Sequence, residues 1–327
     1  MNTVQSFVAT QTVEPLEVDL ASGAYEASAS SLQMDDDPPI TRRGVLTAAL
    51  LVLIGSVAIQ FSSFAASQTF TDLGSPAASS GRMLIAALVL LLVFRPKIRG
   101  LSVSDRWGIV IYGWSMALMN LCLFAAVERM PLGIAVTIEF LGPCAVALLA
   151  SRRLWEGVCA VLALGGVVLI AGPSGQAPII GVLFALGAAG SFAIYTVFAE
   201  RVGKSSDGMG NLALAVCFAA LLLLPFGVAK SSEVTGNHLM WLAVSAVCGA
   251  VIGYGMDTLA AKVTSSRVIG TLFAIDPVMG SLIGWLVMSQ TITRSALAGI
   301  VLVATAGALL VWISGGRSSR GEVEAVT

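Results

Sequence analysis

Charged side chains are scarce in this chain. Asp, Glu, Lys and Arg together make up 11% of its 327 residues, whereas a soluble globular domain usually carries about 25%. Apolar residues make up 57%, and the mean hydropathy is +0.90. So few charges cannot cover a surface that faces water. This excludes a soluble enzyme, a nucleic-acid-binding protein and a disordered scaffold.

Residues that build disulfides, metal centres and nucleotide sites are also few. The five cysteines all lie inside apolar stretches, so they predict neither a disulfide framework nor a metal site. The single histidine, His238, stands in a polar connection, where we expect a loop residue rather than a metal ligand. The chain has no Gly-x-x-x-x-Gly-Lys-Ser/Thr loop, so direct use of ATP is not expected. No cofactor is implied.

Long apolar stretches fill almost the whole chain. A helix needs about 20 apolar residues to span a bilayer core of about 30 Å, and ten windows of that kind follow one another. They predict an all-α polytopic membrane protein with ten transmembrane helices. The windows are 44–66, 76–94, 106–127, 131–150, 154–172, 179–199, 209–229, 239–261, 266–288 and 295–314.

Two polar tails flank these windows. Residues 1–43 hold seven acidic residues and two arginines, lack the apolar core of a signal peptide and are expected to be disordered. Residues 315–327 form the C-terminal tail.

Basic residues are distributed unequally between alternate connections. Cytoplasmic loops carry an excess of Lys and Arg. One set of connections and tails holds fourteen of them, including Arg95, Arg152, Lys204 and Lys262, while the other holds only Arg129, Lys230 and Arg294. This predicts an even number of spans in a cell or inner membrane, with both termini cytoplasmic.

The two halves of the chain share short patterns. Gly-Ser-Val-Ala-Ile at 55–59 is echoed by Gly-Ser-Phe-Ala-Ile at 190–194, and Thr137 and Pro143 match Thr271 and Pro277 at a spacing of 134 residues. The repeating unit contains five spans. Since an odd number of spans reverses the direction of insertion, we expect 44–172 and 179–314 to be inverted repeats, an arrangement typical of secondary transporters.

Two motifs link the chain to a known family. They are Pro-Leu-Gly-Ile-Ala at 131–135 running into Glu-Phe-Leu-Gly-Pro at 139–143, and, in the second half, Gly-Thr-Leu at 270–272 leading to Asp276-Pro277. Over roughly 44–314 the chain resembles the drug/metabolite transporter superfamily with paired EamA-type domains, and within it the bacterial inner-membrane threonine/homoserine exporters. The resemblance implies ten helices, alternating access and efflux of small amino acids.

Windows four and nine are the best candidates for a substrate site, because each is interrupted by proline. Pro143 removes the amide that would bond to the carbonyl of Glu139, and Pro277 does the same for Phe273. A freed carbonyl in a bilayer needs another partner, which can be a substrate, a cation or water. Matched broken helices are typical of transporter binding sites.

Four charged residues lie inside the windows at least four residues from either end. A carboxylate at the centre of a membrane helix costs about 2.5–3.5 kcal/mol, so Glu139 and Asp276 are expected to bind substrate or protons, although each could instead hold helices together. Asp257 stands four residues from the cytoplasmic end of its window and could bind or reach water there. Arg82 could either reach the outer headgroups or balance an intramembrane acid or a substrate carboxylate.

Neutral polar residues inside the windows could complete such a site or bridge helices. They are Ser56, Gln60, Asn120, Tyr195, Tyr254, Thr137 and Thr271. The glycine pairs Gly249/Gly253 and Gly280/Gly284 have the spacing of close helix contacts, within one chain or between two.

The sequence therefore predicts a secondary transporter rather than an enzyme. Its partners would be a small-molecule substrate such as an amino acid, protons and the lipid bilayer, with no nucleic acid. Proton-coupled antiport is the expected mechanism, because a proton and a substrate ammonium can each neutralise the same carboxylate. Efflux of another metabolite or drug, a channel and an interaction protein stay as alternatives. The sequence does not predict the oligomeric state.

Overall fold

The computed structural model describes residues 42–96, 101–149, 158, 161–162, 165–166, 169, 177–205, 207–263, 269–270 and 272–315. Nearly all of these residues are helical, and no strand occurs among them. Residues 1–41 of the tail expected to be disordered, the C-terminal tail from 316 onward and most of window 154–172 lie outside the described residues. Arg42 and Arg43, which were assigned to this tail, begin the first described helix instead.

The helices follow the predicted windows closely. In the first half they are α2 (Arg42–Ser67), α3 (Phe70–Leu73), α4 (Ser75–Phe94), α5 (Val103–Val127), α6 (Leu132–Glu139) and α7 (Leu141–Leu149). In the second half they are α9 (Ile179–Gly203), α10 (Gly208–Ala229), η1 (Ser231–Glu233), α11 (Gly236–Ser245), η2 (Ala246–Gly253), α12 (Tyr254–Val263), η3 (Phe273–Ile275), α14 (Asp276–Leu286) and α15 (Arg294–Gly315).

Six helical stretches in the described part of the chain are long and apolar enough to cross a membrane. They are Leu46–Ser67, Ser75–Phe94, Val103–Val127, Ile179–Gly203, Gly208–Ala229 and Gly236–Val263, and three shorter apolar helices accompany them. The protein is therefore an all-α, multi-pass membrane protein.

Polar side chains mark where several helices begin. The Ser102 hydroxyl accepts a hydrogen bond from the amide of Asp105 at the start of α5, and Asp207 caps α10 in the same way. At α11 the Thr235 hydroxyl accepts from the amide of His238. Such caps satisfy amides that have no partner inside the helix, so these short polar connections determine where the apolar helices begin.

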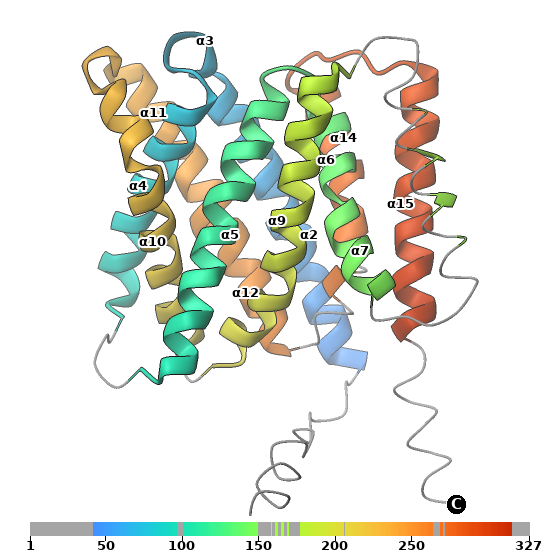
Figure 1. Ribbon diagram of the computed structural model, residues 1–327, viewed down its shortest axis with the longest axis horizontal. Coiled ribbons are helices and arrows are strands. Elements are labelled where there is room, and N and C mark those ends of the chain that lie inside the picture. The colour runs from blue at the N-terminus through green and yellow to red at the C-terminus, as the bar shows by residue number, and fades with distance from the viewer. Residues whose placement is uncertain are drawn as a thin grey trace, which may run out of the picture. The chain divides into compact units, whose positions relative to one another are not determined.

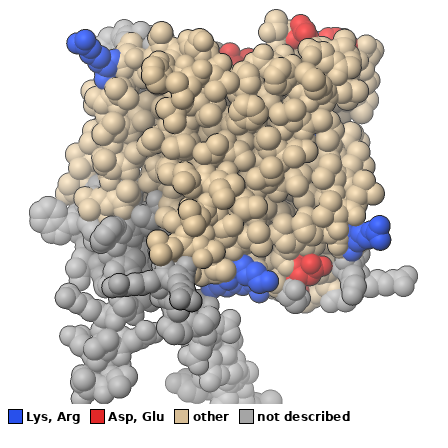
Figure 2. All heavy atoms as spheres, turned by 180° about the vertical axis from the view of Figure 1, so that it is seen from behind, with Lys and Arg blue, Asp and Glu red and all other residues tan. Residues whose placement is uncertain are grey.

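The charged residues on the visible surface gather at its two edges. Figure 2 shows a broad band without Lys, Arg, Asp or Glu between a lower edge and an upper edge that carry them. The α2–α4, α5–α6 and α10–α11 connections lie at one end of the bundle, the upper end in Figure 1, and the α4–α5 and α9–α10 connections lie at the other. An uncharged band between charged edges is what a bilayer requires of the surface it contacts.

Helices of the two halves pack against each other in reciprocal pairs. α5 packs against α9, and α2 packs against η2 and α12. If the two predicted repeats are aligned span by span, α2 corresponds to α9 and α5 to the α11–α12 stretch. In that alignment, exchanging the halves turns the first contact into the second. Two further contacts, α4 with α10 and α6 with α14, each join corresponding helices. The interface between the halves thus runs through the centre of the bundle.

The glycine pairs serve this packing. A β-carbon on Gly280 would lie 3.2 Å from Cβ of Val136 on α6, and one on Gly249 would meet the side chains of Ser62 and Arg82. Packing within the chain, one of the two uses predicted for these glycines, is therefore confirmed.

Candidate functional site

Window four is broken where its proline predicts. α6 ends at Glu139, α7 begins at Leu141, and Pro143 is the third residue of α7. The amide of Phe140 still donates to the carbonyl of Val136 at 2.9 Å. Because Pro143 has no amide hydrogen, the carbonyl of Glu139 lacks its usual helical donor. The carboxylate and the freed carbonyl of Glu139 therefore belong to the same interruption.

Window nine is interrupted too, but the carbonyl of Phe273 is not freed as predicted, because it accepts a hydrogen bond from the amide of Asp276. The short 3-10 turn η3 ends at Ile275, α14 begins at Asp276, and Pro277 lies in its first turn, where proline is well tolerated. The N-terminus of a helix carries a partial positive charge. Asp276 stands at this terminus, directly before the proline that interrupts the window.

Window eight contains a third irregular segment. Ala246–Gly253 forms a π-helix between α11 and α12, and the next residue, Tyr254, begins the helix that carries Asp257. Helical segments of this kind are frequently found at functional sites. The sequence analysis missed it, because no proline marks the segment.

These irregular segments surround one buried cavity. Its volume is about 30 Å³, and its walls come from α2, α4, α5, α6, α9, α12 and α14, hence from both halves. Seven of the nine predicted substrate- or proton-binding residues line it: Arg82, Asn120, Glu139, Tyr195, Tyr254, Asp257 and Asp276. Gln60, Ile59, Met119, Leu123 and Phe192 complete the wall.

Arg82 lies inside this cavity and not at the membrane surface. Its side chain is 2% exposed, so the expectation that it reaches the outer headgroups is wrong. Its guanidinium lies over the rings of Phe124, at 5.2 Å, and Tyr254, at 5.8 Å. Nη2 donates to the Tyr254 hydroxyl at 3.4 Å, while Nε has no partner. Among the described residues, no Asp or Glu lies within ion-pair distance of Arg82.

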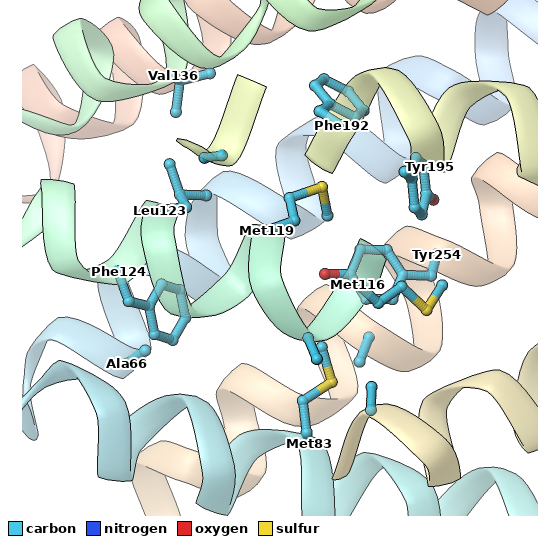
Figure 3. Packing of buried hydrophobic residues seen from close by; sticks show 14 of the residues in the cluster. Ala66, Met83, Met116, Met119, Leu123, Phe124, Val136, Phe192, Tyr195 and Tyr254 are labelled. Carbon is cyan, nitrogen blue, oxygen red and sulfur yellow. The ribbon is translucent and has the colours of Figure 1, made fainter. Parts of the chain in front are cut away.

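Asn120 orients the tyrosine beside this arginine. Its Nδ2 donates to the hydroxyl of Tyr254 and to the carbonyl of Met116, the latter at 3.0 Å. Figure 3 shows Tyr254 beside Met116 and Met119 of α5, with Phe192 and Tyr195 of α9 nearby. Arg82, Asn120 and Tyr254 therefore form one polar cluster with apolar neighbours.

Glu139 and Asp276 supply acidic groups to the same cavity. They are 6% and 7% exposed, respectively, and Oε1 of Glu139 has no hydrogen-bond partner. α6 and α14, which carry them, pack against each other. The site thus holds a buried cation and buried carboxyl groups that form no ion pair with it.

Asp257 is also buried, at 2% exposure, so the expectation that it reaches water is wrong. The hydroxyl of Tyr195 donates to its Oδ2 at 2.9 Å, and Oδ1 has no partner. The Tyr195 ring stacks on Tyr112, with centroids 5.1 Å apart. Phe192 contacts both Tyr195 and Phe273, with centroid distances of 5.7 and 5.0 Å. A continuous aromatic layer therefore adjoins the cavity.

Two predicted residues do not join the site. Thr137 bonds to the carbonyl of Gly133 in its own helix and does not line the cavity, whereas Thr271 lies outside the described residues. Ser56 is buried and its hydroxyl has no partner, but it is not part of the wall. Tyr112 and Phe192 were missed, although Phe192 and Tyr195 have the spacing of residues on one helix face.

His238 is not a loop residue as predicted. It belongs to the first turn of α11, where its Nδ1 accepts from the amide of Thr235 at 3.2 Å and its Nε2 lies 2.9 Å from Oδ2 of Asp72. Within the described parts of the chain, no three His, Cys, Asp or Glu residues could hold a metal ion.

A bundle of membrane-spanning helices with a polar cavity between two halves is the architecture of a transporter. The family model described as the EamA-like transporter family matches residues 179–313, which coincide closely with the predicted second repeat. The chain belongs to this family of the drug/metabolite transporter superfamily. It is a small-molecule transporter.

Similar proteins that align with most of the chain support this assignment. The threonine/homoserine exporter RhtA of Escherichia coli (strain K12) is 30% identical over 270 residues, or 80% of this chain and 90% of that protein. The uncharacterized transporter YvbV of Bacillus subtilis (strain 168) is 27% identical over 286 residues, which cover 82% and 90%. A crystal structure of another protein shares the fold, with a TM-score of 0.55 at 18% identity and coverage of 80% and 96%.

Proposed function

We propose that the protein exports small amino acids of the threonine and homoserine type by alternating access, coupled to proton exchange. The observation that carries the proposal is the cavity, which presents Arg82 and the acids Glu139 and Asp276 without an ion pair between them. A free amino acid carries one carboxylate and one ammonium group. Guanidinium groups suit carboxylates, and carboxylates suit ammonium groups, so one zwitterion would satisfy both kinds of residue.

Alternating access follows from the relation between the halves. We treat 44–172 and 179–314 as inverted five-helix repeats, because their shared patterns coincide with reciprocal contacts between their helices. The cavity of about 30 Å³ is far smaller than the roughly 300–1,000 Å³ of small-molecule sites. Binding therefore requires the halves to move apart, and the broken helices at Pro143 and Pro277 lie between them.

Proton exchange follows from the chemistry of the acids. A proton and a substrate ammonium each neutralise a carboxylate, so they would occupy Glu139 or Asp276 in turn. The substrate would bind the deprotonated site from the cytoplasm and leave outside, and a proton would replace it for the return. Asp257, which accepts from Tyr195, is the next candidate for the proton.

The proposed orientation puts both termini in the cytoplasm. The end of the bundle with Arg95, Arg106 and Arg201 would face the cytoplasm, and the end with Arg129 and Lys230 would face outward. Asp72 and His238, from two connections expected to face outward, lie 2.9 Å apart, which supports placing these connections on one side.

Export from loaded cells tests the substrate. Cells that carry the gene should release labelled threonine and homoserine faster than cells without it. In proteoliposomes, a gradient that drives protons toward the cytoplasmic face of the protein should accelerate transport of the amino acid away from that face. Glu139→Gln should lose this acceleration. Glu233→Gln is the matched control, because Glu233 pairs with Lys230 at the surface. Release of neither amino acid would refute the substrate class, and transport indifferent to the gradient would refute proton coupling.

A further inference from the structure

Four residues of the cavity wall carry polar atoms without hydrogen-bond partners. Arg82, Glu139 and Gln60 differ in kind, while Asp257 is a second carboxyl group. Nε of Arg82 is a cationic donor, Oε1 of Glu139 belongs to a carboxyl group, and Oε1 of Gln60 belongs to a neutral amide. Gln60 lies on α2 and is 2% exposed. Burying a polar group without a partner is unfavourable, and lipid cannot supply the missing bond. A ligand that pairs with all three would remove this cost.

We propose that Gln60 is a specificity-determining residue that recognises the side-chain hydroxyl of a hydroxy amino acid. The inference rests on the proposed function and adds to it. In that proposal Arg82 and Glu139 pair with the carboxylate and the ammonium, which are the two charged groups of any amino acid. A neutral amide neutralises neither charge, so Gln60 is suited to a third, neutral polar group.

A hydroxyl fits this amide better than other neutral groups of similar size. It has one donor hydrogen and two acceptor lone pairs, while the amide offers acceptor lone pairs on oxygen and two hydrogens on nitrogen. The pair therefore forms with either orientation of the amide. A methyl group in the same place would leave the buried amide without a partner.

The remaining wall suits a short aliphatic chain. Ile59, Met119, Leu123 and Phe192 surround the polar residues with apolar surface. A negatively charged side chain would find no second cation in the wall beside Arg82. The wall therefore favours a small amino acid whose only side-chain polar group is a hydroxyl, as in threonine and homoserine.

Isosteric pairs of amino acids test the inference directly. Valine has the shape of threonine with the hydroxyl replaced by a methyl group, and norvaline stands in the same relation to homoserine. A site that bonds a substrate hydroxyl discriminates strongly against an analogue that lacks it. We therefore expect the parent protein to prefer threonine over valine by about tenfold or more, the effect of one buried hydrogen bond.

The experiment measures exchange in proteoliposomes that contain the full chain, without an imposed proton gradient. Internal labelled threonine is exchanged for external threonine, valine, homoserine or norvaline, and the specificity ratio within each pair is compared between parent and Gln60→Leu. The ratio should fall about tenfold in Gln60→Leu through a higher KM for the hydroxy amino acid, with valine little affected.

Gln290→Leu is the matched control. Gln290 lies away from the cavity, and its Oε1 accepts from the amide of Leu132 at 2.9 Å, so its loss could lower total activity but should leave both ratios unchanged. Gln60→Asn, which keeps an amide, should retain part of the preference.

Three results would overturn the inference. They are equal exchange of threonine and valine by the parent, an unchanged ratio in Gln60→Leu, and an equal fall in Gln290→Leu. A parent that exchanges neither threonine nor homoserine would overturn the proposed function as well, so the two failures are distinguishable.

Discussion

The hydrogen bond between Tyr195 and Asp257 offers a quantitative test of the site's structure. Tyr195→Phe removes the hydroxyl that donates to Oδ2 of Asp257 at 2.9 Å and keeps the ring that stacks on Tyr112. Because Oδ1 already has no partner, the variant leaves a fully buried carboxyl group without any donor. Tyr112→Phe is the matched control, since the Tyr112 hydroxyl is buried and has no partner.

The size of the effect depends on the charge of Asp257. Leaving a buried polar group unpaired costs about 1–3 kcal/mol, so Tyr195→Phe should lower the free energy of unfolding by that amount. Tyr112→Phe removes a buried hydroxyl that has no partner, so it should not lower the free energy of unfolding. A double-mutant cycle with Asp257→Leu isolates the pair. Hydrogen bonds between neutral side chains in membrane proteins average about 0.6 kcal/mol. Those to charged groups reach about 1.5–3 kcal/mol.

Unfolding in mixed micelles of a mild and a denaturing detergent, followed by circular dichroism, gives these free energies. A coupling energy near 2 kcal/mol would indicate an ionised Asp257, and one near 0.6 kcal/mol a neutral one. Zero coupling would show that the bond is not formed in the folded protein. A Tyr112→Phe variant as unstable as Tyr195→Phe would show that the loss of stability does not come from this bond.

Three further predictions concern transport and topology. Arg82→Gln should raise the KM for threonine about 10- to 100-fold, because it removes a charge-assisted hydrogen bond. Arg82→Lys should recover only part of this loss, since lysine lacks the planar fork of arginine. If the parent and Arg82→Gln had equal KM values in kinetic assays, this role of Arg82 would be contradicted. Pro143→Ala, which restores a helical donor for the carbonyl of Glu139, and Pro277→Ala should each slow transport without preventing insertion. Parental rates in both variants would refute the broken-helix argument. In a cysteine-free background, Ser232→Cys should react with an impermeant thiol reagent added outside intact cells and Lys262→Cys should not, and the reverse pattern would invert the proposed topology.

Much of the fold could be predicted because a bilayer imposes strong constraints on sequence. The window 76–94 differs by one residue from α4, Ser75–Phe94, since runs of about 20 apolar residues have few other uses. The breaks at Pro143 and Pro277 were predicted from a missing amide, which is a local property. The π-helix over 246–253 was not predictable, because its neighbours on α2 and α4 are distant in the sequence.

The prediction named the charged residues and the two tyrosines that line the cavity, but it missed Phe192 in the wall and Tyr112 beside it. Glu139 and Asp276 stand out in an apolar helix, whereas Tyr112 and Phe192 resemble ordinary packing residues. The burial of Arg82 and Asp257 was not predicted, for a related reason. Counting residues from the end of a window gives a position along the helix axis, but whether a side chain faces lipid, water or the interior depends on how the helices pack.

The unpaired polar atoms themselves argue that the cavity is a binding site. Six buried side-chain atoms lack a hydrogen-bond partner in the described part of the chain, and four of them belong to the cavity wall, on Gln60, Arg82, Glu139 and Asp257. Each costs about 1–3 kcal/mol while unpaired. A cavity of about 30 Å³ has room for one or two water molecules, and a buried water makes about three hydrogen bonds. Water can therefore reduce this cost but cannot neutralise a cation and carboxyl groups together. A zwitterion can, which is why the same residues that would weaken an inert bundle suit a carrier of amino acids.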